Sequence, residues 1–512
     1  MSNLKYWEDK IKQKRKKTDF REFVMGVASW FNIMFYKNEN IICRYPDTNR
    51  IKNILEPNKY FQEYGDGVDG ISYNFDNSFS ENFAKIFINV PKISTIRYGE
   101  NPNCDFADTL FGAKNTYLST CIGQDAENIL YSVMCYANVR NIFNSVLITS
   151  NSENIYFCFQ VINSFNIFYS KYITNSNNIW FSSNLTGCTE CIFCDGLDNQ
   201  SYCIENVKYS KEIYLEKKIQ ILKAKDKFSN FFYTNNVTAT NKLSINTNGS
   251  GVNFSENVEN GFMVNRVKNS RNLAFVDGIN NTSDLYDSFD LAESNDIYGW
   301  MGCGQGSSNM YIGANASASS NIYYSFFMNN CSFCIGCVGL KNKSYCILNK
   351  QYTKEEWYDL ADKIFSQMES GGTLGEFFPG ELNPFYFNDT MAYLIDDSFT
   401  KQEVEKQGYM WRDAEIKVDI PEGVEVIHNK VPLIKGESGS VAETGGFLSD
   451  YQGYDSNGNW QINPEILKKV IKDEKGNIYR IVQMEYDFLV KHGLPLPENH
   501  WLDRIKMGFK FK

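Results

Sequence analysis

The sequence predicts a mainly β protein built from two tandem β-solenoids, with capping helices and small α+β units at its ends. Two observations predict this fold: a repeat of 12 or 13 residues recurs in two parts of the chain, and the module that ends each series is duplicated. The chain has 512 residues, 43% hydrophobic and 15% aromatic, so it is long enough for several domains and too apolar to be disordered. The expected units are a degenerate ribbon-like α+β region (1–98), a first solenoid (99–209), a capping helix and linker (210–235), a second solenoid (236–352), a capping helix with an extended Gly/Pro-rich region (353–440) and a C-terminal degenerate ribbon-like unit (441–512).

The short repeat is marked by a polar residue, most often asparagine, before each apolar run. In the first series the markers are Asn115, Asn128, Asn141, Asn154, Asn166, Asn178 and Glu190, and in the second they are Asn248, Asn260, Asn272, Asp284, Asp296, Asn309, Asn321 and then Phe333. Short β-rich runs joined by Ser/Asn/Gly/Asp turns predict coils that stack about 4.8 Å apart. Helical repeats would need units of about 30 residues and a 3.6-residue period. Asparagine suits such a turn because it tolerates left-handed backbone conformations.

Residues at a fixed distance from the markers form columns of one type. The residue after the marker is branched or sulfur-bearing, so we expect Ile155, Ile167 and Ile179 to form one interior row. Four residues after the marker the column is small, mostly Ser and Cys. The column two residues after the marker is aromatic and too large for a small coil. We therefore expect it to face outwards, exposed or covered by a neighbouring element; the alternative is that two units make one coil. An exposed stripe of rings would form a partner surface, and its candidate residues are Tyr156, Phe168, Trp180, Tyr298, Tyr311 and Tyr323.

The longer repeat ends each series. The segment that starts at Cys188 recurs at Cys331, with 15 identities over 27 positions. A Ser/Thr-Lys-Glu helix start follows each copy, and Thr353 and Glu356 have capping-box spacing. We expect helices near 210–224 and 353–369 to cap the open strand edges of the solenoids.

Each duplicated module carries four cysteines in a C-x2-C-x2-C-x8-C pattern. Four thiolates at such spacings suit a zinc ion or an iron–sulfur cluster. Cys191 and Cys203, like Cys334 and Cys346, are one coil apart, which favours buried packing in the interior row. Disulfide or redox chemistry is a third possibility. No cofactor is expected on the favoured interpretation, and the candidate zinc ligands on the alternative are Cys188, Cys191, Cys194, Cys203, Cys331, Cys334, Cys337 and Cys346.

The net charge of −10 disfavours bulk binding to nucleic acid or anionic lipid. One basic run stands out in the N-terminal segment, where a solvated helix face is the plainer interpretation and local nucleic-acid contact the sharper one. Its cations are Lys10, Lys12, Lys14, Arg15, Lys16 and Lys17. The sequence shows neither a signal peptide nor an apolar stretch that could span a membrane, so we expect no membrane insertion and a cytoplasmic location or a place within an intracellular assembly.

Acidic residues in the turns offer a weaker signal. Paired carboxylates along a solenoid groove are typical of carbohydrate-active β-helix enzymes, although acidic residues in turns are usually only solvated. The candidate carboxylates are Glu190, Asp195, Glu293 and Asp296.

Several segments together resemble a known family. They are CIGCVGLKNKSYCILNKQYTKEEW (334–357), GEFFPGELNPFYFNDT (375–390), KQGYMWRD (406–413), and the weaker matches at 75–92 and 476–497. In these segments the chain resembles the zinc-ribbon, Cys-rich repeat proteins that are widespread in candidate-phyla-radiation bacteria. The resemblance implies terminal ribbons with CxxC knuckles, but this sequence has no CxxC before residue 100 or after residue 440. It therefore implies ribbon-like hairpins that have lost their zinc ligands, and it implies no activity.

The sequence thus predicts a non-enzymatic structural or protein-interaction scaffold that binds a protein partner or assembles with itself. A nucleic-acid- or ribosome-associated protein that uses the basic N-terminal segment is the first alternative. A carbohydrate-active β-helix enzyme is the second.

Overall fold

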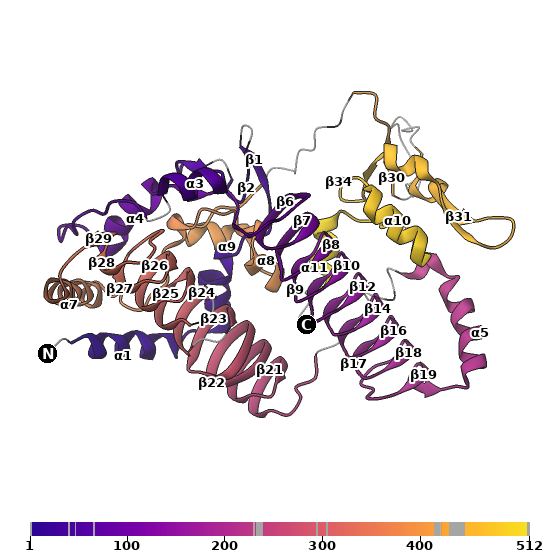
Figure 1. Cartoon of the computed structure of the whole chain (residues 1–512), viewed down its shortest axis with the longest axis horizontal. Helices are drawn as coiled ribbons and strands as arrows, with labels where there is room; N and C mark the ends of the chain where they lie inside the picture. Colours follow the sequence, from indigo (N-terminus) through magenta and orange to yellow (C-terminus); the bar gives the residue numbers. More distant parts are fainter. Residues whose placement is uncertain are drawn as a thin grey trace. The chain divides into compact units, whose positions relative to one another are not determined.

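The computed structural model describes residues 3–38, 41–46, 48–64, 67–228, 231, 239–292, 295–303, 306–413, 420, 422–429 and 446–508. It confirms a mainly β chain with β-solenoid architecture and additional helices (Figure 1). The chain divides into two compact units: Met1–Ile96 with Thr238–Arg412, and Arg97–Val237 with Asp413–Lys510. The terminal regions, expected as separate units, therefore pack with the solenoids. None of the helices in the described ranges combines the length and apolar character needed to cross a membrane.

The first solenoid spans residues 97–208, and each of its regular coils contributes two strands of four residues. Strands of successive coils pair in parallel and build two faces that are joined at β7. The strands are β5 (Arg97–Tyr98), β6 (Cys104–Phe111), β7 (Lys114–Gly123), β8 (Glu127–Leu130), β9 (Val133–Tyr136), β10 (Arg140–Phe143), β11 (Val146–Thr149), β12 (Glu153–Tyr156), β13 (Phe159–Ile162), β14 (Phe165–Phe168), β15 (Lys171–Thr174), β16 (Asn177–Trp180), β17 (Ser183–Thr186), β18 (Thr189–Ile192), β19 (Ser201–Ile204) and β20 (Val207–Lys208).

The expected interior row is confirmed. Ile155 pairs with Ile167, and Ile167 pairs with Ile179, in the register of the parallel strands, and all three are fully buried. The offset between paired residues is 12 or 13, the same as the sequence repeat, so one sequence repeat makes one coil. The alternative of two repeats per coil is therefore wrong.

Every third residue of a coil points inwards. In the coil that begins at Ser152 the inward residues are Ser152, Ile155, Cys158 and Val161, each at most 2% exposed. The residue before an inward one adopts the left-handed conformation, with φ of 56° at Asn154, 58° at Phe157 and 50° at Gln160. These left-handed residues bend the chain four times per coil, which explains how so few residues close a turn. They also place a second set of rings on the outside of the first solenoid, namely Tyr131, Phe157, Tyr169, Phe181 and Phe193.

Two kinds of side-chain ladder run between the coils. In the asparagine ladder each Nδ2 donates to the Oδ1 of the next coil, as from Asn154 to Asn166 (3.1 Å) and from Asn166 to Asn178 (2.9 Å). In the small-residue column each side-chain oxygen accepts from a backbone N–H of the next coil, as Ser145 Oγ accepts from the Cys158 N–H at 3.0 Å. These ladders satisfy polar groups that the narrow interior hides from water.

The second solenoid spans residues 245–351. Its strands are β21 (Ile245–Asn253), β22 (Glu256–Ser283), β23 (Leu285–Ala292), β24 (Asn295–Cys303), β25 (Ser308–Ser317), β26 (Ser320–Asn329), β27 (Ser332–Ile335), β28 (Ser344–Ile347) and β29 (Lys350–Gln351). One coil is longer than the regular repeat, because Arg271 pairs with Tyr286, 15 residues later. Asn272 accordingly donates to Asp287 and not to the expected marker Asp284. The expected uniform column of markers is therefore wrong at this coil.

The last coil of each solenoid is closed in the same way. β20 and β29 turn back and pair antiparallel with β19 and β28. The expected helices follow as α5 (Lys211–Leu222) and α7 (Lys354–Ser370), and the capping box of Thr353 with Glu356 is present. Trp357 of α7 donates its indole N–H to the Cys346 carbonyl of the last coil at 3.3 Å. The capping role predicted for α7 is thus confirmed.

Elements from both ends of unit one cover the outer faces of the second solenoid. The helices are α1 (Leu4–Arg15), α2 (Phe20–Gly26), α3 (Pro57–Tyr64), α4 (Phe79–Asn89), α8 (Met391–Ile395) and α9 (Lys401–Lys406), with strand pairs β1 (Tyr36–Asn38) and β2 (Ile41–Cys43), and β3 (Ile54–Leu55) and β4 (Lys92–Ile93). Their aromatic side chains form the core against the solenoid: the ring of Trp30 lies 4.6 Å from Phe326, and Phe83 lies 4.7 Å from Phe378, between ring centroids.

The C-terminal region packs in the same way on the first solenoid. It contains β30 (Val426–His428), β31 (Gln452–Tyr454), β32 (Trp460–Ile462), β33 (Val470–Lys472), β34 (Ile478–Tyr479), α10 (Gln483–His492) and α11 (Trp501–Gly508). β31 and β32 form a hairpin, and so do β33 and β34. Phe488 of α10 stacks on Phe143 of the solenoid with the ring centroids 4.4 Å apart.

Candidate functional site

The outward ring column of the first solenoid is covered by the chain itself. Tyr156, Phe168 and Trp180 are only 1%, 3% and 6% exposed. Phe488 and His492 of α10 pack on Phe168, and Phe228 packs on Trp180. The rings face outwards as expected, but of the two possibilities the sequence left open, a covered stripe is the one observed.

The corresponding column of the second solenoid is also covered. Tyr298, Tyr311 and Tyr323 stack on one another with centroids 5.2 and 5.0 Å apart, and none is more than 4% exposed. Glu8 of α1 accepts from the Tyr323 hydroxyl at 2.6 Å. Burial, reinforced by the nearby carboxylate of Glu8, raises the pKa of Tyr323. These six residues therefore do not form the free partner surface that an exposed stripe would have offered.

The basic run is engaged with acidic groups and rings of its own unit. Lys10 binds Glu369 at 2.7 Å, and Lys14 binds Glu376. Lys12 lies 3.6 Å from Asp284, and the Lys16 amino group lies 5.4 Å from the Tyr286 ring centroid. Arg15 is fully buried, 3.5 Å from the buried Asp287, and Lys17 is exposed. The run therefore forms ion pairs within its own unit, while the side chains of Lys14, Lys16 and Lys17 stay exposed.

The eight cysteines lie where the packing interpretation places them. Cys191 is in register with Cys203, and Cys334 with Cys346, in the interior rows. Cys188 and Cys194 continue serine columns, and their N–H groups donate to Ser176 Oγ and Ser182 Oγ at 3.0 Å. All eight, which include Cys331 and Cys337, are at most 3% exposed. Packing thus accounts for the position of every one of them.

The thiols of each cluster also touch one another. A hydrogen bond from Cys191 lowers the pKa of Cys188 to about 6, and one from Cys334 lowers the pKa of Cys331 to about 7. The hydrogen bond with Cys188 raises the pKa of Cys191, and the hydrogen bond with Cys331 raises the pKa of Cys334. Lone buried thiols behave differently, since burial raises the pKa of Cys158 to about 12. Within the described ranges, no three Cys, His, Asp or Glu side chains are placed to hold a metal ion.

The carboxylates considered for catalysis have structural partners. Glu190 binds Lys218 of α5 at 2.6 Å. Asp195 accepts from Ser183 and Asn184, both at 3.0 Å, and Asp296 accepts from the Tyr298 hydroxyl at 3.0 Å. Glu293 lies outside the described residues. Each of the three described carboxylates is thus held by a hydrogen bond or an ion pair within its own unit.

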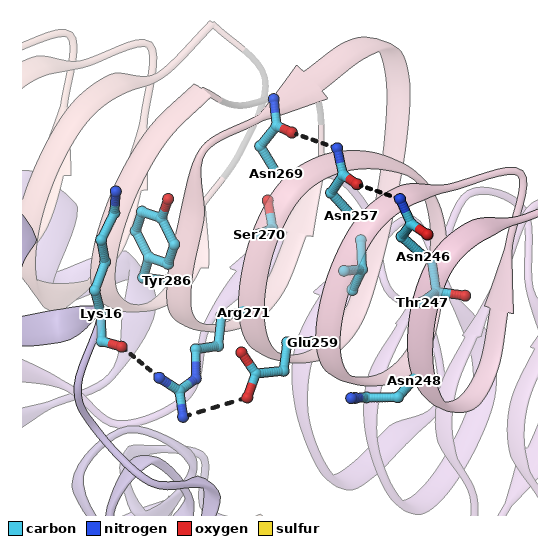
Figure 2. A pocket seen from close by; sticks show the side chains of 11 residues that line it. Lys16, Asn246, Thr247, Asn248, Asn257, Glu259, Asn269, Ser270, Arg271 and Tyr286 are labelled. Atoms are coloured by element: carbon cyan, nitrogen blue, oxygen red, sulfur yellow. Dashed lines mark hydrogen bonds and ion pairs between the residues drawn. The ribbon is translucent and has the colours of Figure 1, made fainter.

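A groove of about 560 Å³ opens on the first coils of the second solenoid (Figure 2). Asn246, Asn257 and Asn269 line one side as a hydrogen-bonded ladder, with Nδ2 to Oδ1 distances of 3.2 and 3.1 Å. Arg271 and Glu259 line the other side as an ion pair at 3.5 Å, and Tyr286 lies at one end. The sequence did not reveal this groove, because Asn246, Asn257 and Asn269 recur like other ladder residues and no local pattern shows that α1 ends before it covers them.

Comparison with protein-family models, with curated proteins and with solved structures returned no match to this chain.

Proposed function

We propose that the protein is a non-enzymatic interaction scaffold whose solenoids bind protein segments on their outer faces. The observation that carries this proposal is that each solenoid already binds segments distant in sequence. Tyr323 of the second solenoid bonds Glu8, 315 residues away, and Phe143 of the first stacks on Phe488. Because these segments already cover the ring columns, a partner segment is expected on the outer surface that they leave uncovered.

The recognition rests on regular geometry. Each coil adds one outward ring to a column, and the parallel ladders hold the backbone rigidly, so little conformational entropy is lost on binding. A helix meets such a column with apolar and cationic side chains: Ile11 is fully buried, and Lys12 lies 5.3 Å from the Tyr298 ring centroid. Cation–π contacts and ring burial together suit an amphipathic basic helix.

Within the part of the chain that the structure describes, the first coil of the second solenoid exposes apolar side chains. Leu243 and Ile245 are 79% and 64% exposed, and Phe254, next to it, is 55% exposed. The last coil, in contrast, is closed by β29. Open strand edges with apolar side chains favour pairing with another chain. We therefore place self-assembly at this end, with a second copy of the chain as the partner.

The cellular setting is part of the same proposal. The eight cysteines of the two clusters are free thiols, as expected in a reducing compartment. A cytoplasmic assembly fits this state.

Cross-linking in the native host, followed by native mass spectrometry of the full chain, tests the proposal. We expect dimers or larger assemblies that are lost on Leu243→Glu with Ile245→Lys. Phe165→Glu is the matched control, because Phe165 is 50% exposed and belongs to the first solenoid, not to this coil. A bare monomer in the host, without any partner, would contradict the scaffold proposal.

A further inference from the structure

The outward column of the second solenoid changes character where α1 ends. Tyr323, Tyr311, Tyr298 and Tyr286 occupy successive coils, and α1 lies over them as far as Lys16. In the preceding coils Arg271 and then Glu259 take the place of the rings. The groove begins at this change. The aromatic part of the column is covered by α1, and the polar part that precedes it is open.

The lining offers hydrogen bonds along its whole length. In the ladder of Asn246, Asn257 and Asn269, the middle amide uses one N–H and one oxygen lone pair to bind its two neighbours. A second N–H and a second lone pair of that amide remain. Asn257 Nδ2 donates to Asn269 and its Oδ1 accepts from Asn246, so both of its remaining positions are available to a ligand. The ladder thus presents alternating donors and acceptors at the coil spacing of about 4.8 Å.

Arg271 adds an unmet donor on the opposite side. Its guanidinium donates to the Lys16 carbonyl and pairs with Glu259, as Figure 2 shows. Its buried Nε–H has no acceptor among the described residues. Because Glu259 balances the charge of Arg271, this side of the groove is polar without being strongly cationic.

We propose that this groove binds a linear, uncharged saccharide chain that runs along the solenoid axis. A polymer that repeats the same hydroxyl groups matches a wall that repeats the same amide from coil to coil. Nucleic acid would need uncompensated cations along its phosphates. A peptide that adds to a sheet pairs through backbone groups at a strand edge, whereas the feature of this groove that repeats from coil to coil is its lining of side chains.

The site is suited to binding and not to cleavage. Glycoside hydrolysis generally uses two carboxyl groups on either side of the scissile bond. Among the residues that line the groove Glu259 is the sole carboxylate, and it is held by Arg271. The saccharide is therefore expected to leave the groove unchanged.

Isothermal titration calorimetry on the full chain tests this inference, with cellohexaose, xylohexaose, hexa-N-acetylchitohexaose and maltohexaose as uncharged probes and hexagalacturonate as the anionic comparison. The key variant is Asn257→Gly, which removes the amide and keeps the left-handed backbone, since φ is 54°. Asn163→Gly is the matched control: its φ is 46°, and it donates to Asn175 at 2.8 Å in an exposed ladder of the first solenoid. Glu259→Gln is a second groove variant in case Asn257→Gly unfolds.

We expect at least one uncharged hexasaccharide to bind, Asn257→Gly to weaken it about fivefold or more, and Asn163→Gly to leave it unchanged. High-performance liquid chromatography after the titration should show that the saccharide still has its original chain length. Absence of binding for all four uncharged probes at millimolar concentration would overturn the inference. So would equal losses in Asn257→Gly and Asn163→Gly, or a salt-sensitive preference for hexagalacturonate. The inference is independent of self-assembly, because Leu243 and Ile245 do not line the groove.

Discussion

Replacing Asn166 with glycine and with alanine separates two contributions to the stability of the asparagine ladder: the side-chain hydrogen bonds and the left-handed backbone conformation. Asn166 donates to Asn178 at 2.9 Å, accepts from Asn154 at 3.1 Å, and has a φ of 56°. Glycine removes both hydrogen bonds and keeps the backbone unstrained. Alanine removes the same bonds and also places a β-carbon in the left-handed region.

The magnitudes follow from these contacts. Each lost hydrogen bond costs about 1 kcal/mol net, so both variants lose about 2 kcal/mol. Alanine adds about 1–2 kcal/mol for the left-handed conformation, and glycine adds about 0.4–1 kcal/mol because its unfolded chain is freer. We therefore expect losses of about 3.5 kcal/mol for Asn166→Ala and about 2.7 kcal/mol for Asn166→Gly.

Native-state hydrogen exchange in urea, read by mass spectrometry on peptides that cover residues 153–180, measures this local stability. Peptides from the second solenoid serve as the internal reference, since the two solenoids belong to different compact units. Unchanged exchange in both variants would refute the ladder argument. A larger loss for Asn166→Gly than for Asn166→Ala would refute the argument from the left-handed backbone.

Three further predictions follow from buried groups. Burial lowers the pKa of His500 from 6.5 to about 4, so the folded state resists its protonation. Its contribution to stability should be full above pH 6.5 and fall by up to about 3 kcal/mol as the pH drops towards 4. His500→Phe should reduce the fall in the urea midpoint across that range, and the part that remains is expected from His492, whose pKa burial also lowers to about 4. Arg15→Met should lower the free energy of unfolding by about 3 kcal/mol at pH 8, where it leaves the charge of Asp287 buried and uncompensated. The loss should be smaller at pH 5, because burial raises the pKa of Asp287 to about 7 and the carboxyl is then protonated. Equal losses at both pH values would contradict this. If Cys191 serves only as a packed side chain, Cys191→Val should lower the free energy of unfolding by less than about 1.5 kcal/mol. Mass spectrometry of the purified protein should then find no stoichiometric zinc or iron. One metal ion per cluster would show the packing interpretation to be wrong.

Much of the solenoid could be predicted from the sequence because its contacts are local and periodic. Residues such as Ile155 and Ile167 meet one coil later, so a fixed spacing in the sequence becomes a contact in space. The asparagine ladder and the closing capping box at Thr353 follow from the same regularity.

The remaining features depend on contacts that no local pattern reveals. Glu8 meets Tyr323 across 315 residues, so the sequence alone could not show that the ring column is covered. The basic run looked free for the same reason, because Glu369, the partner of Lys10, lies far along the chain. The long coil was missed because Arg271 pairs with Tyr286 only when three residues more than the regular repeat are counted.

The repeated coil makes the length of this protein adjustable in equal increments. Each coil meets the next through the same ladders, and the duplicated module at Cys188 and Cys331 terminates both series with the same hairpin. Inserting 12 residues between Ile167 and Ile179 would lengthen the first solenoid by about 4.8 Å and leave both of its ends intact. Adding or removing single coils would therefore change the distance between the two ends of the solenoid in steps of about 4.8 Å, without any change to the residues at either end.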